Sequence, residues 1–157
     1  MADTETHEVI RYTVDVVIVT QEGSLRRVLR RVLRRFDTRR VLLIERGWDP
    51  YEDHWALPGG HVNLGEASRD AAVRELFEET GVRVDPASLR QIGVFDKPGR
   101  DPRGRYVTVA YLAFVPADTA IVAGDDARNA HRWPLAALPT LAFDHADILD
   151  TVLKQHN

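Results

Sequence analysis

Three stretches of the chain carry the apolar pattern that is typical of β-strands. They are rich in valine and in other β-branched or aromatic residues, which favour strands. They span residues 11–20 (RYTVDVVIVT), 41–45 (VLLIE) and 106–115 (YVTVAYLAFV), and the first of them alternates apolar with polar positions. We expect each stretch to form one strand of a sheet.

The segments between these strands predict loops and shorter elements. The glycines, prolines and acids of residues 45–60 predict a loop. Residues 82–85 and 90–96 resemble short strands on either side of a Pro-Ala-Ser turn. A loop at 123–131 (AGDDARNAH) is expected before another short strand, which ends near Trp133.

Two segments after residue 60 predict helices, and the first of these has an unusual acidic side. At about 100° per residue, Glu75, Glu78 and Glu79 project together from one side of a helix, and Gly81 is a natural residue to end it. Residues 142–155 predict a second helix near the end of the chain. The expected core side of the first helix carries Val73, Leu76, Phe77 and Thr80.

A strongly basic segment occupies residues 24–40. It holds eight arginines, and Ser24 is a candidate N-cap. We interpret it as an amphipathic helix that packs on the domain or on a second subunit; an extended hairpin is the alternative. Membrane or nucleic-acid binding is less expected, because the net charge of the chain is −3. Its apolar residues at helical spacing are Leu25, Val28, Leu29, Val32, Leu33 and Phe36.

The order of elements predicts an α+β fold or a sandwich built on a mixed sheet, because strands and helices do not alternate regularly. At 157 residues the chain fits one domain, residues 1–157, in which the polar residues 1–8 are expected to be flexible. No repeat or linker suggests a second domain.

Composition excludes several kinds of chemistry. The chain has no cysteine, so thiol catalysis and disulfides are excluded, and its six histidines show no spacing typical of a zinc site. Neither a GxSxG elbow nor a Walker lysine is present. The N-terminus lacks a basic region followed by an apolar stretch, and the longest apolar run is too short to span a bilayer, so we expect a cytoplasmic protein with no membrane partner.

The acidic side of the first helix predicts a metal site. Like charges three and four residues apart destabilise an isolated helix by roughly 0.2–0.5 kcal/mol per pair. A hard divalent cation such as Mg²⁺, bound by carboxylates and substrate phosphates, would turn this repulsion into coordination. A solvated acidic surface is the alternative.

Residues 60–82 contain a set of glycine, acidic, basic and aliphatic residues at fixed spacing: Gly60, Glu66, Arg74, Glu75, Leu76, Glu78, Glu79, Gly81 and Val82. The set resembles the signature of Nudix hydrolases, G-x5-E-x7-R-E-U-x-E-E-x-G-U, where U is a bulky aliphatic residue, and no fixed position is missing. The resemblance implies an α/β/α sandwich over about residues 10–155 and hydrolysis of a pyrophosphate bond.

The resemblance also implies roles for these residues. Glu75 and Glu79 are the expected ligands of Mg²⁺, or of Mn²⁺ as the alternative, and Glu78 is a third ligand or activates the attacking water. A backbone carbonyl of Gly59 or Gly60 is a further candidate ligand, since glycine lets the backbone pass close to metal and phosphate. The expected catalytic residues are Glu75, Glu78 and Arg74, with Glu66 as a supporting residue in a salt bridge to Arg74. The general base is a glutamate of the motif or one of two acids in a later loop, Asp125 and Asp126, although a surface turn explains that loop equally well.

The loop at 95–105 (FDKPGRDPRGR) indicates which class of substrate to expect. Pro98 lies sixteen residues after Val82, as in Nudix hydrolases that resemble ADP-ribose pyrophosphatases. Arginines bind phosphate oxygens bidentately, so Arg100 and Arg103, with Arg105 as a further candidate, are expected to contact a diphosphate or ribose; solvated loop arginines are the alternative. The resemblance implies that Arg46, just after a strand, also contacts phosphate. Trp48 is expected to stack on adenine, with Tyr51 and Trp55 as alternatives, although Trp55 could instead belong to the core.

We therefore expect hydrolysis of ADP-ribose to AMP and ribose 5-phosphate. The alternatives are another nucleotide substrate, such as a nucleoside triphosphate, a dinucleoside polyphosphate or NADH, and a sensor that binds ADP-ribose without hydrolysis. The expected partners are a small nucleotide and a second copy of the chain in a homodimer, and no nucleic acid is expected.

Overall fold

The computed structural model describes residues 7–21, 39–124 and 127–155. Most of the predicted basic helix at 24–40 lies outside these residues, as do the candidate bases Asp125 and Asp126 and most of the expected flexible segment at 1–8. Within 24–40, Arg40 belongs to a strand rather than to a helix.

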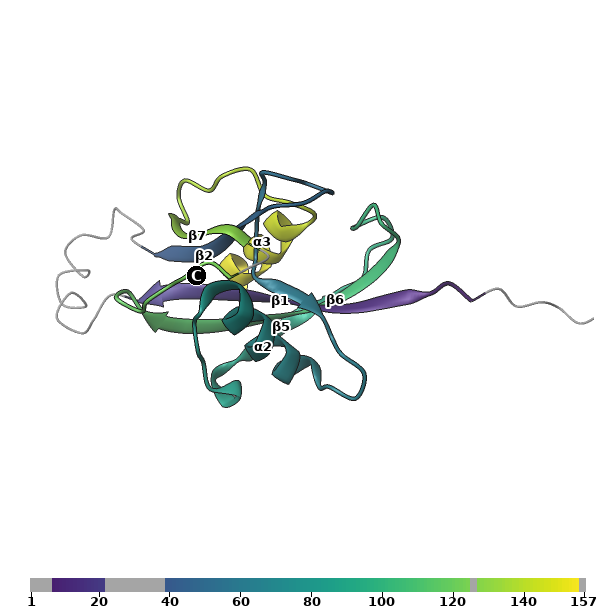
Figure 1. Cartoon of the computed structure of the whole chain (residues 1–157), viewed down its shortest axis with the longest axis horizontal. Coiled ribbons are helices and arrows are strands. Elements are labelled where there is room, and N and C mark those ends of the chain that lie inside the picture. Colours follow the sequence, from purple (N-terminus) through teal and green to yellow (C-terminus); the bar gives the residue numbers. More distant parts are fainter. Residues whose placement is uncertain (1–6, 22–38, 125–126, 156–157) are drawn as a thin grey trace, which may run out of the picture.

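A mixed sheet of seven strands forms the centre of the molecule (Figure 1). Its two longest strands, β1 (Ile10–Gln21) and β6 (Arg105–Pro116), run parallel along their whole length, and the other pairs are antiparallel. The order is β3-β2-β1-β6-β5, with β4 also paired to β1 and β7 to β2. The remaining strands are β2 (Arg40–Arg46), β3 (Trp55–Ala56), β4 (Gly59–His61), β5 (Arg90–Phe95) and β7 (Ala127–Pro134).

Two helices cover opposite faces of this sheet, α2 (Ser68–Thr80) on one side and α3 (His145–Gln155) on the other (Figure 1). Side chains of a strand alternate between its faces. Val16 of β1 therefore packs in the cluster that contains Leu76 of α2, and Val17 packs in the cluster that contains Ile148 of α3. The valine-rich pattern of β1 thus reflects burial on both faces, and the predicted α+β sandwich with a mixed sheet is confirmed.

The three long predicted strands are confirmed, but the shorter elements needed correction. The loop expected at 45–60 contains the short strands β3 and β4, and residues 82–85 are not a strand. The Pro-Ala-Ser turn is a 3₁₀ helix, η1 (Pro86–Ser88). β7 begins inside the loop expected at 123–131. Pairing with neighbouring strands explains β4 and β7, whose own sequences have low strand propensity.

Helix α2 buries one side and ends as the sequence predicts. Leu76 and Thr80 have no exposed surface, and Gly81 adopts the left-handed conformation with φ 69° while its N–H donates to the carbonyl of Phe77. Phe77, however, was expected on the core side and is 38% exposed. The guanidinium of Arg83 covers its ring at 3.7 Å, so a cation contact replaces core packing.

The carbonyl end of α2 is capped by the segment before β7. The N–H of Val122 donates to the carbonyl of Thr80 and that of Gly124 to the carbonyl of Glu79, both at 2.9 Å. The last turn of a helix leaves carbonyls without partners inside the helix. These two bonds therefore hold the end of α2 that carries the acidic residues.

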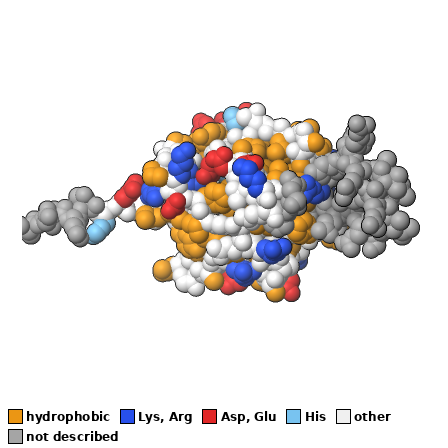
Figure 2. Space-filling view, turned by 180° about the vertical axis from the view of Figure 1, so that it is seen from behind, with side chains coloured by type: hydrophobic (Ala, Val, Ile, Leu, Met, Phe, Trp, Pro, Cys, Tyr) orange, Lys and Arg blue, Asp and Glu red, His pale blue; other side chains and the backbone are white. Residues whose placement is uncertain are grey.

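One face of the molecule carries charges of both signs. In the view from behind, the described Lys and Arg side chains lie interspersed with Asp and Glu (Figure 2). None of the described helices is long and apolar enough to cross a membrane.

The contrast between Leu76 and Phe77 gives a test of the packing of α2. Leu76→Ala should destabilise the protein by about 2–5 kcal/mol, because it removes buried methyl groups and leaves a cavity. The neighbouring Phe77→Ala should cost only about 1 kcal/mol, since its ring is partly exposed. Urea unfolding of both variants measures the two values, and equal losses would contradict this packing.

Candidate active site

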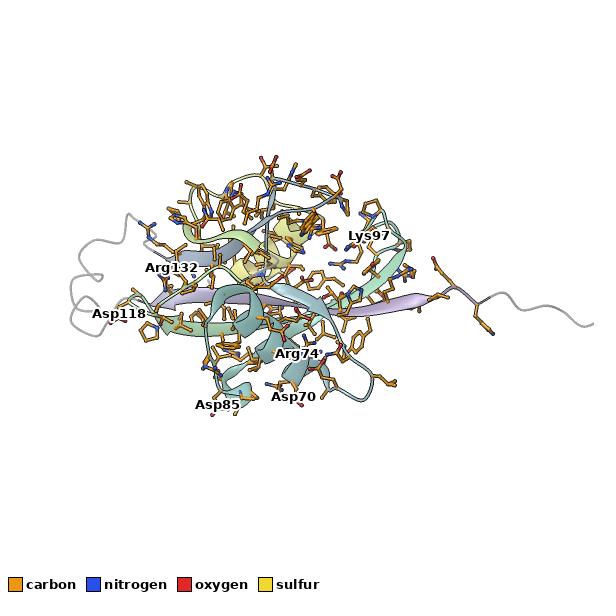
Figure 3. All side chains as sticks on the ribbon, in the orientation of Figure 1. Asp70, Arg74, Asp85, Lys97, Asp118 and Arg132 are labelled. Atoms are coloured by element: carbon orange, nitrogen blue, oxygen red, sulfur yellow. The ribbon has the colours of Figure 1, made fainter. Side chains whose placement is uncertain are left out.

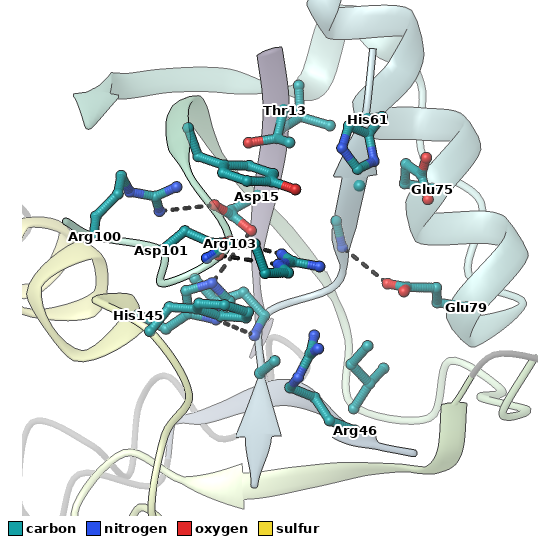
Figure 4. Close-up of a pocket in the computed structure, with 18 of the residues that line it drawn as sticks. Thr13, Asp15, Arg46, His61, Glu75, Glu79, Arg100, Asp101, Arg103 and His145 are labelled. Carbon is teal, nitrogen blue, oxygen red and sulfur yellow. Dashed lines mark hydrogen bonds and ion pairs between the residues drawn. The ribbon is translucent and has the colours of Figure 1, made fainter. Parts of the chain in front are cut away.

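A cavity of about 440 Å³ opens between α2 and the ends of the central strands (Figure 4). Its walls come from segments far apart in the sequence, which include the strands β1, β2, β4 and β6, the helix α2, the loop after β5 and the start of α3. Its charged and histidine side chains are Asp15, Arg46, His61, Glu75, Glu78, Glu79, Arg100, Asp101, Arg103 and His145.

One wall of the cavity is acidic and is formed by Glu75, Glu78 and Glu79 of α2. Strand β4 lies directly against it. The backbone N–H of Gly59 donates to Glu79 Oε2 at 2.9 Å, and a Cβ placed on Gly60 would lie 2.5 Å from the carboxyl carbon of Glu75. A side chain at position 60 would therefore displace the Glu75 carboxylate from its present place, and glycine lets the backbone approach this acid closely.

Arg74 connects this wall to the loop before α2 (Figure 3). Its guanidinium makes two hydrogen bonds of 2.8 Å to Glu66, so the expected salt bridge is present and bidentate. It also contacts Glu75 at 2.7 Å and Glu78 at 3.1 Å and donates to the carbonyl of His61. The hydrogen bond from Arg74 holds the pKa of Glu66 down to about 2, with a backbone hydrogen bond from Asn63 assisting.

The chemistry of this wall fits a hard divalent cation. Burial raises the pKa of Glu75; Arg74 opposes that rise and the nearby charge of Glu78 adds to it, so a bound cation would favour the ionised form. In the described part of the chain, no three acidic or histidine side chains converge as they stand on a common ion position. Glu75 and Glu78 turn to Arg74, and Glu79 accepts from Gly59. The donors nevertheless share one cavity and are the oxygen ligands that Mg²⁺ prefers.

The opposite side of the cavity carries arginines. Arg103 is held by Asp101 through hydrogen bonds of 3.0 and 2.6 Å, and its side chain remains 41% exposed. Arg46 donates to the carbonyl of Pro50, and its guanidinium lies 4.8 Å from the centre of the Phe143 ring. Burial lowers the pKa of Arg46, and the like charge of Arg103 lowers it further. An anion between the two guanidiniums would relieve this repulsion.

Arg100 also lines the cavity but is committed to other groups. Its side chain is 5% exposed and makes two hydrogen bonds, of 2.8 and 2.6 Å, to Asp144. Arg105, the further candidate, does not line the cavity; it donates to the backbone carbonyl of Asp96. The structure thus brings Arg46, Arg100 and Arg103 together and leaves Arg105 outside.

Pro98 and Trp48, two residues expected to bind substrate, do not line the cavity. Pro98 is exposed in the loop between β5 and β6, beside Lys97 at the edge of the molecule (Figure 3). Trp48 is 71% exposed. Among the alternatives for stacking, Tyr51 packs on Phe143 with ring centres 4.8 Å apart, and Trp55 packs on Trp133.

Several residues of the cavity were not predicted from the sequence, and they include Asp15, Tyr106, Phe143 and His145. Asp15 had a detectable signal, since it is the one charged residue among the apolar residues of the strand at 11–20 apart from Arg11 at its start. Tyr106 lies on β6, Phe143 lies in the turn before α3, and His145 is the first residue of α3. Only the folded chain brings them into the same cavity as the glutamates of α2.

His145 lines the cavity as a buried, neutral ring. Its Nδ1 accepts a hydrogen bond of 2.9 Å from the N–H of Leu57, so the remaining proton is assigned to Nε2. Burial lowers the pKa of His145 although Asp15 and Asp144 act in the opposite direction. The contact of 3.4 Å from Nε2 to Asp15 is therefore a long interaction of a neutral ring and not a salt bridge.

The comparison with protein families agrees with this geometry. The family model of the NUDIX domain matches residues 25–152, which is most of the chain. The chain belongs to the Nudix family. The acidic helix, the glycine strand and the Glu66–Arg74 pair are thus the Nudix motif in its folded form.

Relatives of this Nudix chain include proteins of two kinds. An ADP-ribose pyrophosphatase from Methanocaldococcus jannaschii is 41% identical over 118 residues, which cover 75% of this chain and 68% of that protein. An ADPR responsive transcriptional repressor, NtrR, from Acinetobacter baylyi is 35% identical over 74% of this chain, but over only 48% of its own length.

A solved structure is similar along almost the whole Nudix chain. It is the NUDIX domain of Shewanella oneidensis NrtR in complex with ADP ribose, with a TM-score of 0.79 and 26% sequence identity; the match covers 99% of this chain and 94% of that one. The confirmed fold therefore extends beyond the motif itself.

The pair between Glu66 and Arg74 gives a prediction about pH. Because the pKa of Glu66 is lowered from 4.5 to about 2 in the folded protein, its contribution to stability is present above pH 4.5 and is lost as the pH falls towards 2. Wild type should therefore be more stable than Glu66→Gln at neutral pH, with a difference that shrinks below pH 4.5. Urea unfolding of both proteins at a series of pH values measures this difference, and one that does not change with pH would contradict the assignment.

Proposed function

We propose that this Nudix protein hydrolyses the pyrophosphate bond of ADP-ribose, giving AMP and ribose 5-phosphate. One observation supports the proposal most directly: a single cavity has three glutamates on one side and the guanidinium groups of Arg46 and Arg103 on the other. A diphosphate needs both, since its oxygens bind metal on one side and guanidinium groups on the other. The archaeal relative named as an ADP-ribose pyrophosphatase supports the choice of substrate.

Glu75, Glu78 and Glu79 are the residues that would hold Mg²⁺, or Mn²⁺ in its place, together with a backbone oxygen of Gly59 or Gly60. When bound, the ion supplies neutralisation of the phosphate charge and lowers the pKa of a bound water. Arg74 sets the direction of two of the three carboxylates through its contacts with Glu75 and Glu78. Its role in catalysis is therefore to position these acids.

Arg46 and Arg103 would bind the phosphate oxygens from the other side. Both are anchored, Arg46 by the carbonyl of Pro50 and Arg103 by Asp101, so little freedom of motion remains to be lost on binding. Arg100 contributes mainly by fixing the walls, because its donors are engaged with Asp144.

Hydrolysis adds the oxygen of water to one phosphorus and breaks its bond to the bridging oxygen, while a proton leaves the water. Glu78 is our candidate to accept that proton. Its side chain is 55% exposed, the most accessible of those in the Arg74 cluster, and it lines the cavity. Asp125 and Asp126 stay alternatives for this role.

A sensor that binds ADP-ribose without cleaving it is the second candidate. The similarity to the ADPR responsive repressor and to the NrtR domain in complex with ADP ribose favours it. The intact set of glutamates favours hydrolysis. The cytoplasmic location and the homodimer expected from the sequence stay predictions.

The test uses metal-stripped protein and a panel of nucleotides that includes ADP-ribose, NADH, a nucleoside triphosphate and a dinucleoside polyphosphate. AMP release from ADP-ribose should require Mg²⁺, and Glu78→Gln and Glu79→Gln should each lower kcat by about 10²- to 10⁴-fold. Glu52→Gln is the matched control, because Glu52 pairs with Arg128 outside the cavity.

Three results would overturn the proposal in different ways. Binding of ADP-ribose without turnover would favour the sensor. Faster turnover of another nucleotide would keep the site and change the substrate. Full activity of both Glu78→Gln and Glu79→Gln would show that these two glutamates are not needed for hydrolysis.

The arginines can be tested separately through Arg103 and Arg105. Arg103→Lys keeps the charge but loses the bidentate geometry, so kcat/KM for ADP-ribose should fall about 10- to 100-fold, as expected for one charge-assisted interaction. Arg105→Lys should leave it nearly unchanged, because Arg105 lies outside the cavity. Steady-state kinetics with both variants decides whether the arginine side contacts the substrate, and equal effects would show that it does not.

A further inference from the structure

One acid of the cavity does not belong to the acidic wall of α2. Asp15 lies on β1 and is only 8% exposed, yet it lines the cavity beside Arg100 and His145 (Figure 4). The Nudix motif does not include it, and the proposed hydrolysis does not use it. A carboxylate buried in this way normally has close partners.

The partners of Asp15 are unusually distant. Its Oδ2 lies 3.6 Å from Arg100 Nη2, and its Oδ1 lies 3.4 Å from His145 Nε2. Good hydrogen bonds to a carboxylate are about 2.7–2.9 Å long. An ionised carboxylate has about four acceptor positions, so Asp15 keeps unused acceptor capacity in the wall of the cavity.

The two groups beside Asp15 are themselves fixed. Asp144 holds Arg100 through two hydrogen bonds, and the N–H of Leu57 holds His145. Neither can move to Asp15 without losing these bonds. The gap around the carboxylate is therefore part of the folded structure and is ready for a ligand.

The charges around this gap select the kind of ligand group. A phosphate would be repelled by the Asp15 carboxylate. A group that only donates would leave the Nε2–H of His145, and the N–H groups of Arg100 that Asp144 does not engage, without a close acceptor. A hydroxyl both donates and accepts. Two neighbouring hydroxyls can donate to the two oxygens of Asp15 and accept from the donors on either side.

We propose that Asp15 accepts hydrogen bonds from the vicinal hydroxyls of a substrate sugar and so determines specificity. The inference rests on the proposed function, in which the substrate contains two riboses joined by a diphosphate. The geometry points to a sugar diol as the group that Asp15 binds. The experiment decides which of the two riboses supplies this diol.

The experiment compares three ligands in the presence of Mg²⁺. They are ADP-ribose, its analogue without the 2′-hydroxyl of adenosine, and the methyl ester of ADP, which lacks the distal ribose. Wild type should turn over one of the two analogues about 10- to 100-fold less efficiently than ADP-ribose, because Asp15 then loses a hydrogen-bond donor.

The variant Asp15→Asn tests the residue itself. It should lower kcat/KM for ADP-ribose by a similar factor and have little effect on the analogue that lacks the recognised hydroxyl. Asp150→Asn, on the outer part of α3 and away from the cavity, is the matched control. An equal loss with all three ligands would show that Asp15 has only a structural role, and no loss would also overturn the proposal.

The design separates this inference from the proposed function. If wild type turns over none of the ligands, hydrolysis fails as a function, and the same comparison of dissociation constants by calorimetry decides the role of Asp15. If Asp15→Asn does not fold, the discrimination by wild type among the three ligands still decides it, and equal efficiency or equal affinity for all three would overturn the proposal.

Discussion

The crowding of negative charge on one side of α2 is the constraint on which the site depends. Glu75, Glu78 and Glu79 lie within two turns of helix, and such an arrangement is unfavourable by itself. Arg74 offsets part of this repulsion because its guanidinium contacts Glu75 and Glu78. The carboxylate of Glu66 also binds this guanidinium and fixes its position. Because Glu66 stands in the loop before α2, the charge network also fixes the loop to the helix.

The rest of the fold supports this arrangement. The opposite side of α2 is anchored by Leu76 in a core cluster against β1, and its carbonyl end is capped by Val122 and Gly124. Strand β4 brings the backbone of Gly60 against Glu75 through its pairing with β1. Strand β1, buried on both faces, is thus the common support of the acidic wall, the glycine strand and Asp15.

Parts of the fold and of the site could be predicted from the sequence when the residues that form them lie close together along the chain. The residues of the acidic wall lie within 60–82, where spacing alone places Glu75 and Glu79 one turn apart, and the long strands were clear from their valine content. Asp15 and His145 meet across 130 positions, and no local pattern links them. Pro98 was expected at the site from its spacing to the motif, and Trp48 from its aromatic ring. The folded chain places neither of them in the wall of the cavity.

The central claim is that the acidic wall binds a divalent cation, and calorimetric titration of metal-stripped protein with Mn²⁺ tests it most directly. We predict saturable binding of Mn²⁺ by wild type, an affinity at least tenfold weaker in Glu75→Gln, and an affinity like that of wild type in the control Glu52→Gln. Absence of binding by wild type, or equal affinity in wild type and Glu75→Gln, would contradict it.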